Sequence, residues 1–167
     1  MSEPRNKTIS TPEGPVATTT TTVDPTPQQI KQASAEDVAV FAAYAEQAPE
    51  FVKTYVPAAA APTLKDCDEA FRLWQLQAKS SYTRQHVVEI LGAYLGARLI
   101  SDFQMDWVVV TDEYGTDYAV RSKRYEVMAF PFSSVVKRIE RNQYDFMVGV
   151  YYSVKSSLES GDYKERK

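Results

Sequence analysis

The sequence predicts an α+β fold in which helices pack on a small three-stranded antiparallel sheet. Apolar residues recur at helical spacing before residue 103 and after residue 131, whereas β-branched and aromatic runs lie between them. All aromatic residues (11 Tyr, 7 Phe and 2 Trp) follow residue 33, so one core of ordinary size forms from the remaining chain. The expected order is helix-helix-helix-strand-strand-strand-helix-helix.

Composition divides the chain into three parts. Residues 1–33 are rich in Thr and Pro, and we expect a disordered tail because they bury too little apolar surface to offset chain entropy. Residues 34–160 are expected to form a single α+β domain. Residues 161–167 are highly charged and are expected to be a frayed tail.

Capping residues and apolar stripes define the expected helices before the sheet. Ser34 and Thr63 are N-cap residue types that precede helical spacing. The helix from about 84 to 101 is apolar on nearly every side and is expected to be central. Gly92 and Gly96 lie one turn apart on it. Because each glycine costs a helix about 1 kcal/mol relative to alanine, we expect a neighbouring element to approach closely there.

The sheet and the last helices follow from a change of period. Trp107 opens a run of β-branched residues, and Gly115 occupies a turn position where positive φ is often required. Pro131 suits the first position of the next helix, and Asp145 has the cap type for the last one. Trp107, Gly115 and Pro131 are therefore expected to be structural. The three strands of the expected meander lie near 107–111, 117–121 and 125–130.

Charge and cysteine content exclude several classes of ligand and indicate the cellular compartment. With 19 basic and 22 acidic residues the formal net charge is −3, so bulk attraction to nucleic acid or an anionic membrane is not expected. Cys67 is the single cysteine, which excludes an internal disulfide framework or a cysteine-rich zinc site and fits a reducing compartment. The start of the chain lacks the pattern of a secretory signal, and we expect a cytoplasmic protein without a cofactor or metal.

Charge is segregated in the half of the chain that contains the sheet. Residues 102–117 hold five carboxylates and no basic residue, whereas residues 121–141 hold six basic residues and two acidic ones. Two interpretations stay open: docking surfaces for a partner, or a solvated turn beside a solvated helix face. The residues assigned to partner binding are Asp112, Glu113, Tyr114, Asp117, Arg121, Lys137, Arg138 and Arg141.

A series of motifs resembles a known bacterial family. In order, they are Leu91-Gly92-x-x-Leu95-Gly96, Trp107-Val108, Asp112-Glu113-Tyr114-Gly115-x-Asp117, Phe130-Pro131 and Lys137-Arg138. Over roughly residues 63–160 the chain resembles a family defined only as a domain of unknown function (the 3806 type). The resemblance implies a bacterial setting and one domain, and it assigns no reaction, cofactor or ligand.

Two functions from different classes are expected. Nucleophile, phosphate-loop and dinucleotide motifs are absent from the sequence, and His86 is the single imidazole. The first hypothesis is therefore a non-catalytic intracellular module that binds a protein, with an immunity protein that neutralises a toxin as the specific case. The alternative is a metal-assisted hydrolase with His86 or Glu89 as proton carrier and a carboxylate cluster of Asp102, Asp106, Asp112 and Asp117.

Overall fold

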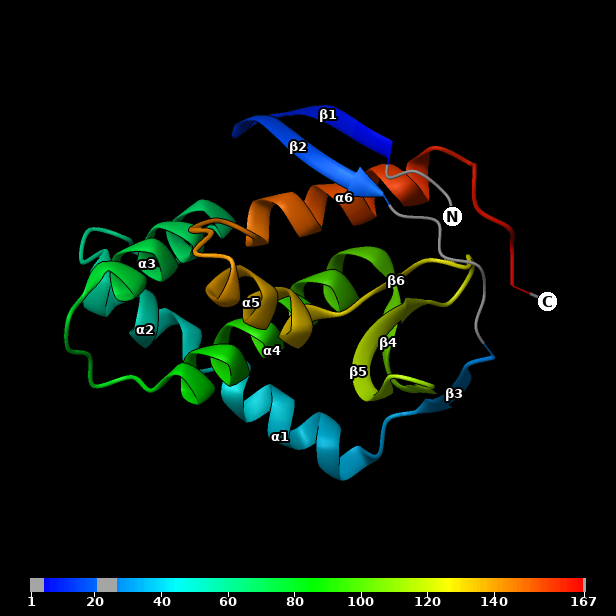
Figure 1. Ribbon diagram of the computed structural model, residues 1–167, viewed down its shortest axis with the longest axis horizontal. Coiled ribbons are helices and arrows are strands. Elements are labelled where there is room, and N and C mark those ends of the chain that lie inside the picture. The colour runs from blue at the N-terminus through cyan, green and yellow to red at the C-terminus, as the bar shows by residue number, and fades with distance from the viewer. Residues whose placement is uncertain (1–4, 21–26, 167) are drawn as a thin grey trace.

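The computed structural model describes residues 5–20 and 27–166 and has an α+β fold (Figure 1). Its four-stranded sheet is antiparallel throughout, in the order β3–β4–β5–β6, and a separate antiparallel pair joins β1 to β2. The strands are β1 (Arg5–Thr11), β2 (Gly14–Thr20), β3 (Gln29–Gln32), β4 (Met105–Asp112), β5 (Gly115–Ser122) and β6 (Met128–Ala129). The helices are α1 (Ala35–Ala45), α2 (Ala48–Tyr55), α3 (Leu64–Leu76), α4 (Arg84–Phe103), α5 (Pro131–Glu140) and α6 (Met147–Glu159).

The expected order has one helix too few before the sheet. The segment after Ser34 forms two helices, because α1 ends at Ala45 and α2 has Pro49 in its first turn, where the sequence predicts an interruption followed by a short further turn. Proline lacks an N–H and is tolerated where a helix begins, since the first N–H groups have no partner inside the helix. A proline in the middle of an apolar pattern therefore starts a new helix here.

Helix α4 is the centre of the fold. It packs against α1, α2, α5 and α6 and against both long strands, β4 and β5. Its two glycines lie where other elements approach most closely. A Cβ atom at Gly96 would lie 2.1 Å from Cζ2 of Trp107 on β4, and a Cβ atom at Gly92 would lie 2.4 Å from Cδ1 of Phe132 on α5. The close approach expected at these glycines is present, with the sheet at one glycine and with a helix at the other.

The sheet is not the three-stranded meander that the sequence predicts. Strand β3, from the segment expected to be a disordered tail, pairs with β4 and adds a fourth strand. Ile30 of β3 packs against the small apolar cluster of Val108, Val110 and Ala119 on the second face of the sheet. Strand β3 is held by backbone hydrogen bonds to the edge of β4 and by the burial of Ile30. Its composition alone does not predict an ordered segment.

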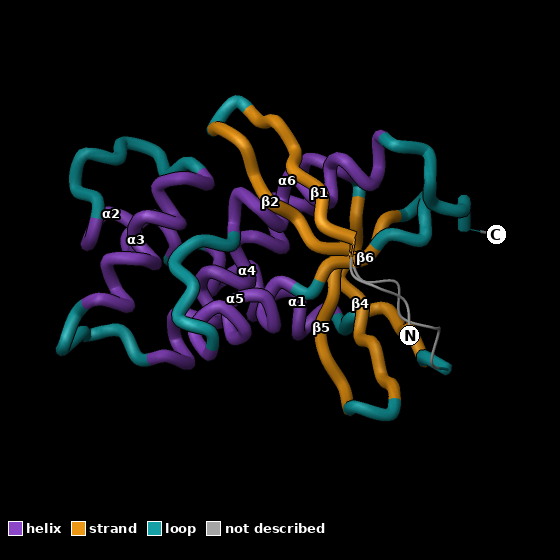
Figure 2. The backbone as a smooth tube through the Cα atoms, turned by 45° about the horizontal axis from the view of Figure 1, so that its top comes forward, coloured by secondary structure: helices purple, strands orange, loops and turns teal. Residues whose placement is uncertain are grey.

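The segment expected to be a tail also contains the β1–β2 hairpin, which lies across α6 (Figure 1). Thr11-Pro12-Glu13-Gly14 makes its turn: the Thr11 hydroxyl donates to the Gly14 carbonyl oxygen at 2.7 Å, and Gly14 has a φ of 111°. Figure 2 shows this hairpin and the β4–β5 hairpin extending in opposite directions. Residues 1–4 and 21–26 of the expected tail lie outside the described residues.

The C-terminal segment was also expected to fray, and its described part instead returns to the sheet. Glu165 forms a β-bridge with Tyr125, and its carboxylate lies 2.9 Å from the Arg124 guanidinium. The Arg166 N–H donates to the Arg124 carbonyl oxygen at 2.8 Å. Backbone pairing and opposite charges hold this segment, while Lys167 lies outside the described residues.

Candidate docking groove

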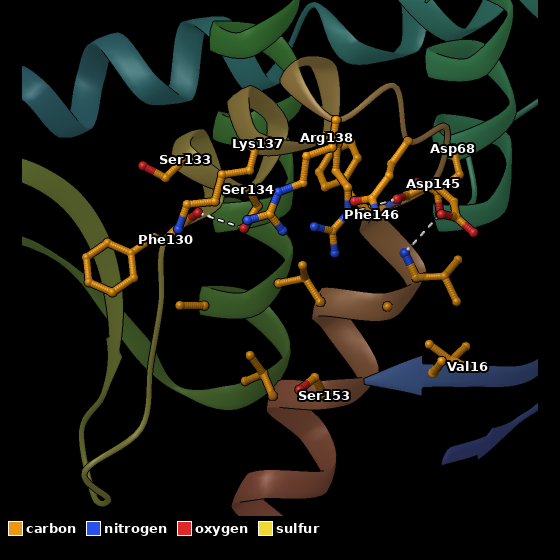
Figure 3. Close-up of a pocket in the computed structure, with 18 of the residues that line it drawn as sticks. Val16, Asp68, Phe130, Ser133, Ser134, Lys137, Arg138, Asp145, Phe146 and Ser153 are labelled. Carbon is orange, nitrogen blue, oxygen red and sulfur yellow. Dashed lines mark hydrogen bonds between the residues drawn. The ribbon is translucent and has the colours of Figure 1, made fainter. Parts of the chain in front are cut away.

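A groove of about 960 Å³ lies between the β1–β2 hairpin, α5 and α6 (Figure 3). Helix α6 forms its floor. Helix α5 and strand β6 form one wall, the hairpin forms the other, and α3 closes one end. The groove therefore combines segments that are more than a hundred residues apart in the sequence.

The α5 wall carries hydroxyl groups and cations. Ser133, Ser134, Lys137, Arg138 and Arg141 recur at helical spacing along one face of this helix and line the groove. In Figure 3 the Lys137 and Arg138 side chains extend from α5 into the space above α6. Arg138 Nε donates to the Asp145 carbonyl oxygen at 3.2 Å. Lys137 and Arg141 are exposed, and neither forms an ion pair with any of the described residues.

The hairpin wall is less charged and lies directly on α6. Pro15, Val16 and Ala17 face the groove, and a Cβ atom at Gly149 of α6 would meet Val16 at an ordinary 3.6 Å. A hydrogen bond between the Tyr152 hydroxyl and the Glu13 carboxylate raises the pKa of Tyr152. The acidic side chain of this wall is thus already bound to a donor.

Asp68, which the sequence analysis missed, lies at the end of the groove formed by α3. It is 7% exposed, and its carboxylate accepts the N–H groups of Phe146, Met147 and Val148 at 2.9, 2.8 and 3.0 Å. These are N–H groups at the start of α6, so a side chain of α3 caps α6. Burial raises the pKa of Asp68 to about 6, and the three N–H donors oppose that rise.

This cap corrects the expectation for Asp145, because no side chain of the α6 N-terminal segment itself caps the helix. A signal for Asp68 is present in the sequence. Asp68 lies beside Cys67 on a helix whose buried stripe includes Leu64 and Phe71. A carboxylate at a buried position of an apolar stripe requires donors from elsewhere in the fold.

The residues predicted to bind a partner separate into two groups. Lys137, Arg138 and Arg141 meet in the groove, whereas Asp112, Glu113 and Tyr114 form the β4–β5 turn and do not line it. In that turn the Tyr114 N–H donates to Asp112 Oδ1 at 2.8 Å, and the Tyr114 side chain is 85% exposed. A hydrogen bond to Glu113 raises the pKa of Tyr114.

Asp117 and Arg121 belong to neither group. Asp117 accepts a hydrogen bond from the Ser133 hydroxyl and so connects β5 to the first turn of α5. Arg121 forms an ion pair with Glu126 at 3.0 Å, and its Nε is buried without a hydrogen-bond partner among the described residues. Both side chains have structural contacts inside the sheet half of the fold.

The carboxylates of the alternative hypothesis have separate partners. Asp102 binds Arg98 at 3.1 Å and the Tyr151 hydroxyl at 2.8 Å, and Asp106 lies 3.4 Å from Lys123. Within residues 5–20 and 27–166, no three His, Cys, Asp or Glu side chains are grouped so that they could hold a metal ion. The proposed proton carriers are also engaged elsewhere: the His86 ring contacts Gln47 at 2.9 Å, and Glu89 accepts from Gln85.

Comparison with known proteins connects part of this fold to a family. Residues 71–151 match the family model of the domain of unknown function DUF3806. This match confirms the resemblance inferred from the motifs, over a shorter range than 63–160. The DUF3806 region includes α4, the long strands and the basic wall of α5, and it excludes Asp68 and the β1–β2 hairpin.

The other comparisons concern the fold alone. No curated protein matches the chain. A crystal structure of a protein from Bacteroides thetaiotaomicron VPI-5482 is similar, with a TM-score of 0.54 and 11% sequence identity. The similarity covers 86% of this chain, which spans about half (52%) of the length of that protein. Among the described residues, no helix is both long enough and apolar enough to cross a bilayer.

Proposed function

We propose that this chain is a non-catalytic protein-binding module of the bacterial cytoplasm and that its docking surface is the groove between the hairpin, α5 and α6. The observation that carries this proposal is the pair of exposed cations on α5. Lys137 and Arg141 line the groove without an ion pair among the described residues, so their charge is available to a partner. An immunity protein is the case in which the partner is a toxin.

Two further features support a docking surface over a catalytic one. The groove is lined by Val16, Val148, Val150 and Val154 beside its charged wall, and a mixture of apolar and charged side chains is typical of protein interfaces. The buried acid in it, Asp68, is held by three N–H donors and is not free to transfer a proton to a ligand without uncapping α6.

The test is a charge reversal on the basic wall. The variant Lys137→Glu with Arg141→Glu should lose the partner that the wild-type chain co-purifies from its native cells. Stability should change by less than about 1 kcal/mol, because both side chains are exposed. Identification of the co-purified protein then decides whether it is a toxin.

A matched control changes the same amount of charge elsewhere. Lys31→Glu with Lys53→Glu alters two exposed lysines on β3 and α2, neither of which lines the groove. This control should retain the partner. Loss of the partner in both variants, or in neither, would show that the groove is not the docking surface.

A further inference from the structure

We infer that the groove binds an extended segment of a partner protein in which acidic and apolar residues alternate. This inference rests on the proposed function and names the chemistry of the partner. It follows from three observations: the spacing of the two cations, the hydrogen bonds that already engage the acidic side chains in the groove, and the uncharged residues of its floor.

The spacing of the cations matches an extended chain. Lys137 lies in the last turn of α5 and Arg141 is its C-cap residue, whose N–H donates to the Lys137 carbonyl oxygen at 3.1 Å, so four residues of helical rise place their Cα atoms about 6 Å apart along the axis. In a β-strand, side chains on the same face repeat about every 7 Å. An extended segment that lies along α5 can therefore present a carboxylate to each cation from residues i and i+2.

The acids in the groove leave these two cations available. Asp68 is bound to the three N–H groups of α6, and Glu13 is hydrogen-bonded to Tyr152 on the opposite side. Asp145 lies beside Asp68 at the end of the groove in Figure 3. The α5 face of the groove, from Ser133 to Arg141, contains no acidic lining residue, so charge complementarity favours an acidic occupant.

The opposite face of an extended occupant meets a different surface. Gly149, Val150 and Val154 of α6 and Val16 of the hairpin line the groove, and none carries a charge. Because successive side chains of a strand point to opposite faces, the residues between the acidic ones would face this surface. Apolar side chains there would remove further apolar area from water.

Two peptides of identical composition test the spacing. The probes are fluorescently labelled Glu-Val-Glu-Val-Glu-Val and its rearranged form Glu-Glu-Val-Val-Glu-Val, which has no two glutamates at i and i+2, and binding to the full chain is measured by fluorescence anisotropy at ~150 mM salt. The alternating peptide should bind about twofold to fivefold more tightly, the range that one extra exposed charge pair gives. Equal affinities, or no binding of either peptide, would overturn the inference.

Variants of the chain test the location. Lys137→Gln with Arg141→Gln should weaken binding of the alternating peptide about tenfold or more, whereas the exposed pair Lys31→Gln with Lys53→Gln should leave it unchanged. At Ser153 on the floor, Ser153→Lys should strengthen binding and Ser153→Glu should weaken it. If the two Ser153 variants changed the affinity for the peptide in the same direction, the effect would be structural and not electrostatic. That result would count against the inference.

Two outcomes separate this inference from the proposed function. If the native partner depends on Lys137 and Arg141 but the alternating peptide shows no preference, the docking surface stands and the extended acidic segment is wrong. If the native partner is retained by the charge-reversal variant, the proposed function itself is wrong. Tighter binding of a 12-residue RNA than of the alternating peptide would identify a nucleic acid as the ligand and overturn both.

Discussion

Replacement of Gly96 by alanine tests the packing on which the architecture depends. The added Cβ would lie 2.1 Å from Cζ2 and 2.3 Å from Cη2 of Trp107, whereas an ordinary contact begins near 3.4 Å. The ring or the helix must therefore move by about 1.3 Å. Trp107 is 6% exposed and packs against Phe41 and Phe132, with ring centroids at 4.8 and 5.5 Å, so the indole has aromatic neighbours that resist this movement.

Two opposing effects set the magnitude. Alanine gains about 1 kcal/mol of helix propensity over glycine. Overpacking of a close-packed core costs about 1–3 kcal/mol, and the large displacement required here favours the upper end. We expect the free energy of unfolding to fall by about 2 kcal/mol, which for a chain of this size lowers the melting temperature by about 4–8 °C.

The assay is urea denaturation followed by far-UV circular dichroism, with Gly149→Ala as the control. At Gly149 the nearest atom to an added Cβ is Val16 Cγ1 at 3.6 Å, so the same substitution should leave stability unchanged or raise it by up to about 1 kcal/mol. In addition, Trp107→Phe should cost less in the Gly96→Ala background than in the wild type, because the two sites are coupled. A Gly96→Ala variant as stable as the wild type would refute this account of α4 packing.

The remaining predictions concern α3. Asp68→Ala should lower the free energy of unfolding by about 2–4 kcal/mol because three N–H groups lose their acceptor. Asp66→Ala, which removes only the exposed carboxylate that accepts from the Thr63 N–H and hydroxyl at the start of α3, should cost about 0.5–1.5 kcal/mol in the same denaturation assay. Since the pKa of Asp68 rises from 3.8 to about 6 on folding, the folded state binds more protons between these values. Its contribution to stability should fall by about 2 kcal/mol as the pH rises from 4 to 6, and Asp68→Asn should abolish that slope in a pH series. Burial raises the pKa of the Cys67 thiol to about 12, so a thiol reagent should label Cys67 only after unfolding; rapid labelling of the folded chain would contradict the buried position.

The elements that sequence reasoning predicted well are those with local signals. The long apolar pattern of α4, the capping box of Thr63 with Asp66 and the Gly115 turn each depend on residues within one or two turns of each other. The close packing at the two glycines of α4 was also predictable. Two glycines one turn apart destabilise a core helix unless a neighbouring element packs closely against them.

The elements that were missed depend on partners far away in the sequence. Strand β3 exists because it pairs with β4, about 80 residues later, and the C-terminal segment pairs with residues 124–126. The β1–β2 hairpin did have a local signal, since Thr11-Pro12-Glu13-Gly14 is a turn sequence beside β-branched residues. Its Thr- and Pro-rich composition outweighed that signal in the sequence analysis.

The groove could not be predicted from the charge pattern alone, because its two sides come from different parts of the chain. The cations were visible as a run between residues 121 and 141, but the acidic turn next to them in the sequence extends to another side of the fold. The cations line a groove because the β1–β2 hairpin packs on α6 and because Asp68 caps that helix. Both lie outside the region that matches DUF3806, whereas the basic wall lies inside it. The charge that would attract a partner and the apolar wall that would enclose it are therefore supplied by separate segments. A chain that matches over the same residues but lacks the hairpin would keep the cations on an open face and lose the enclosed groove.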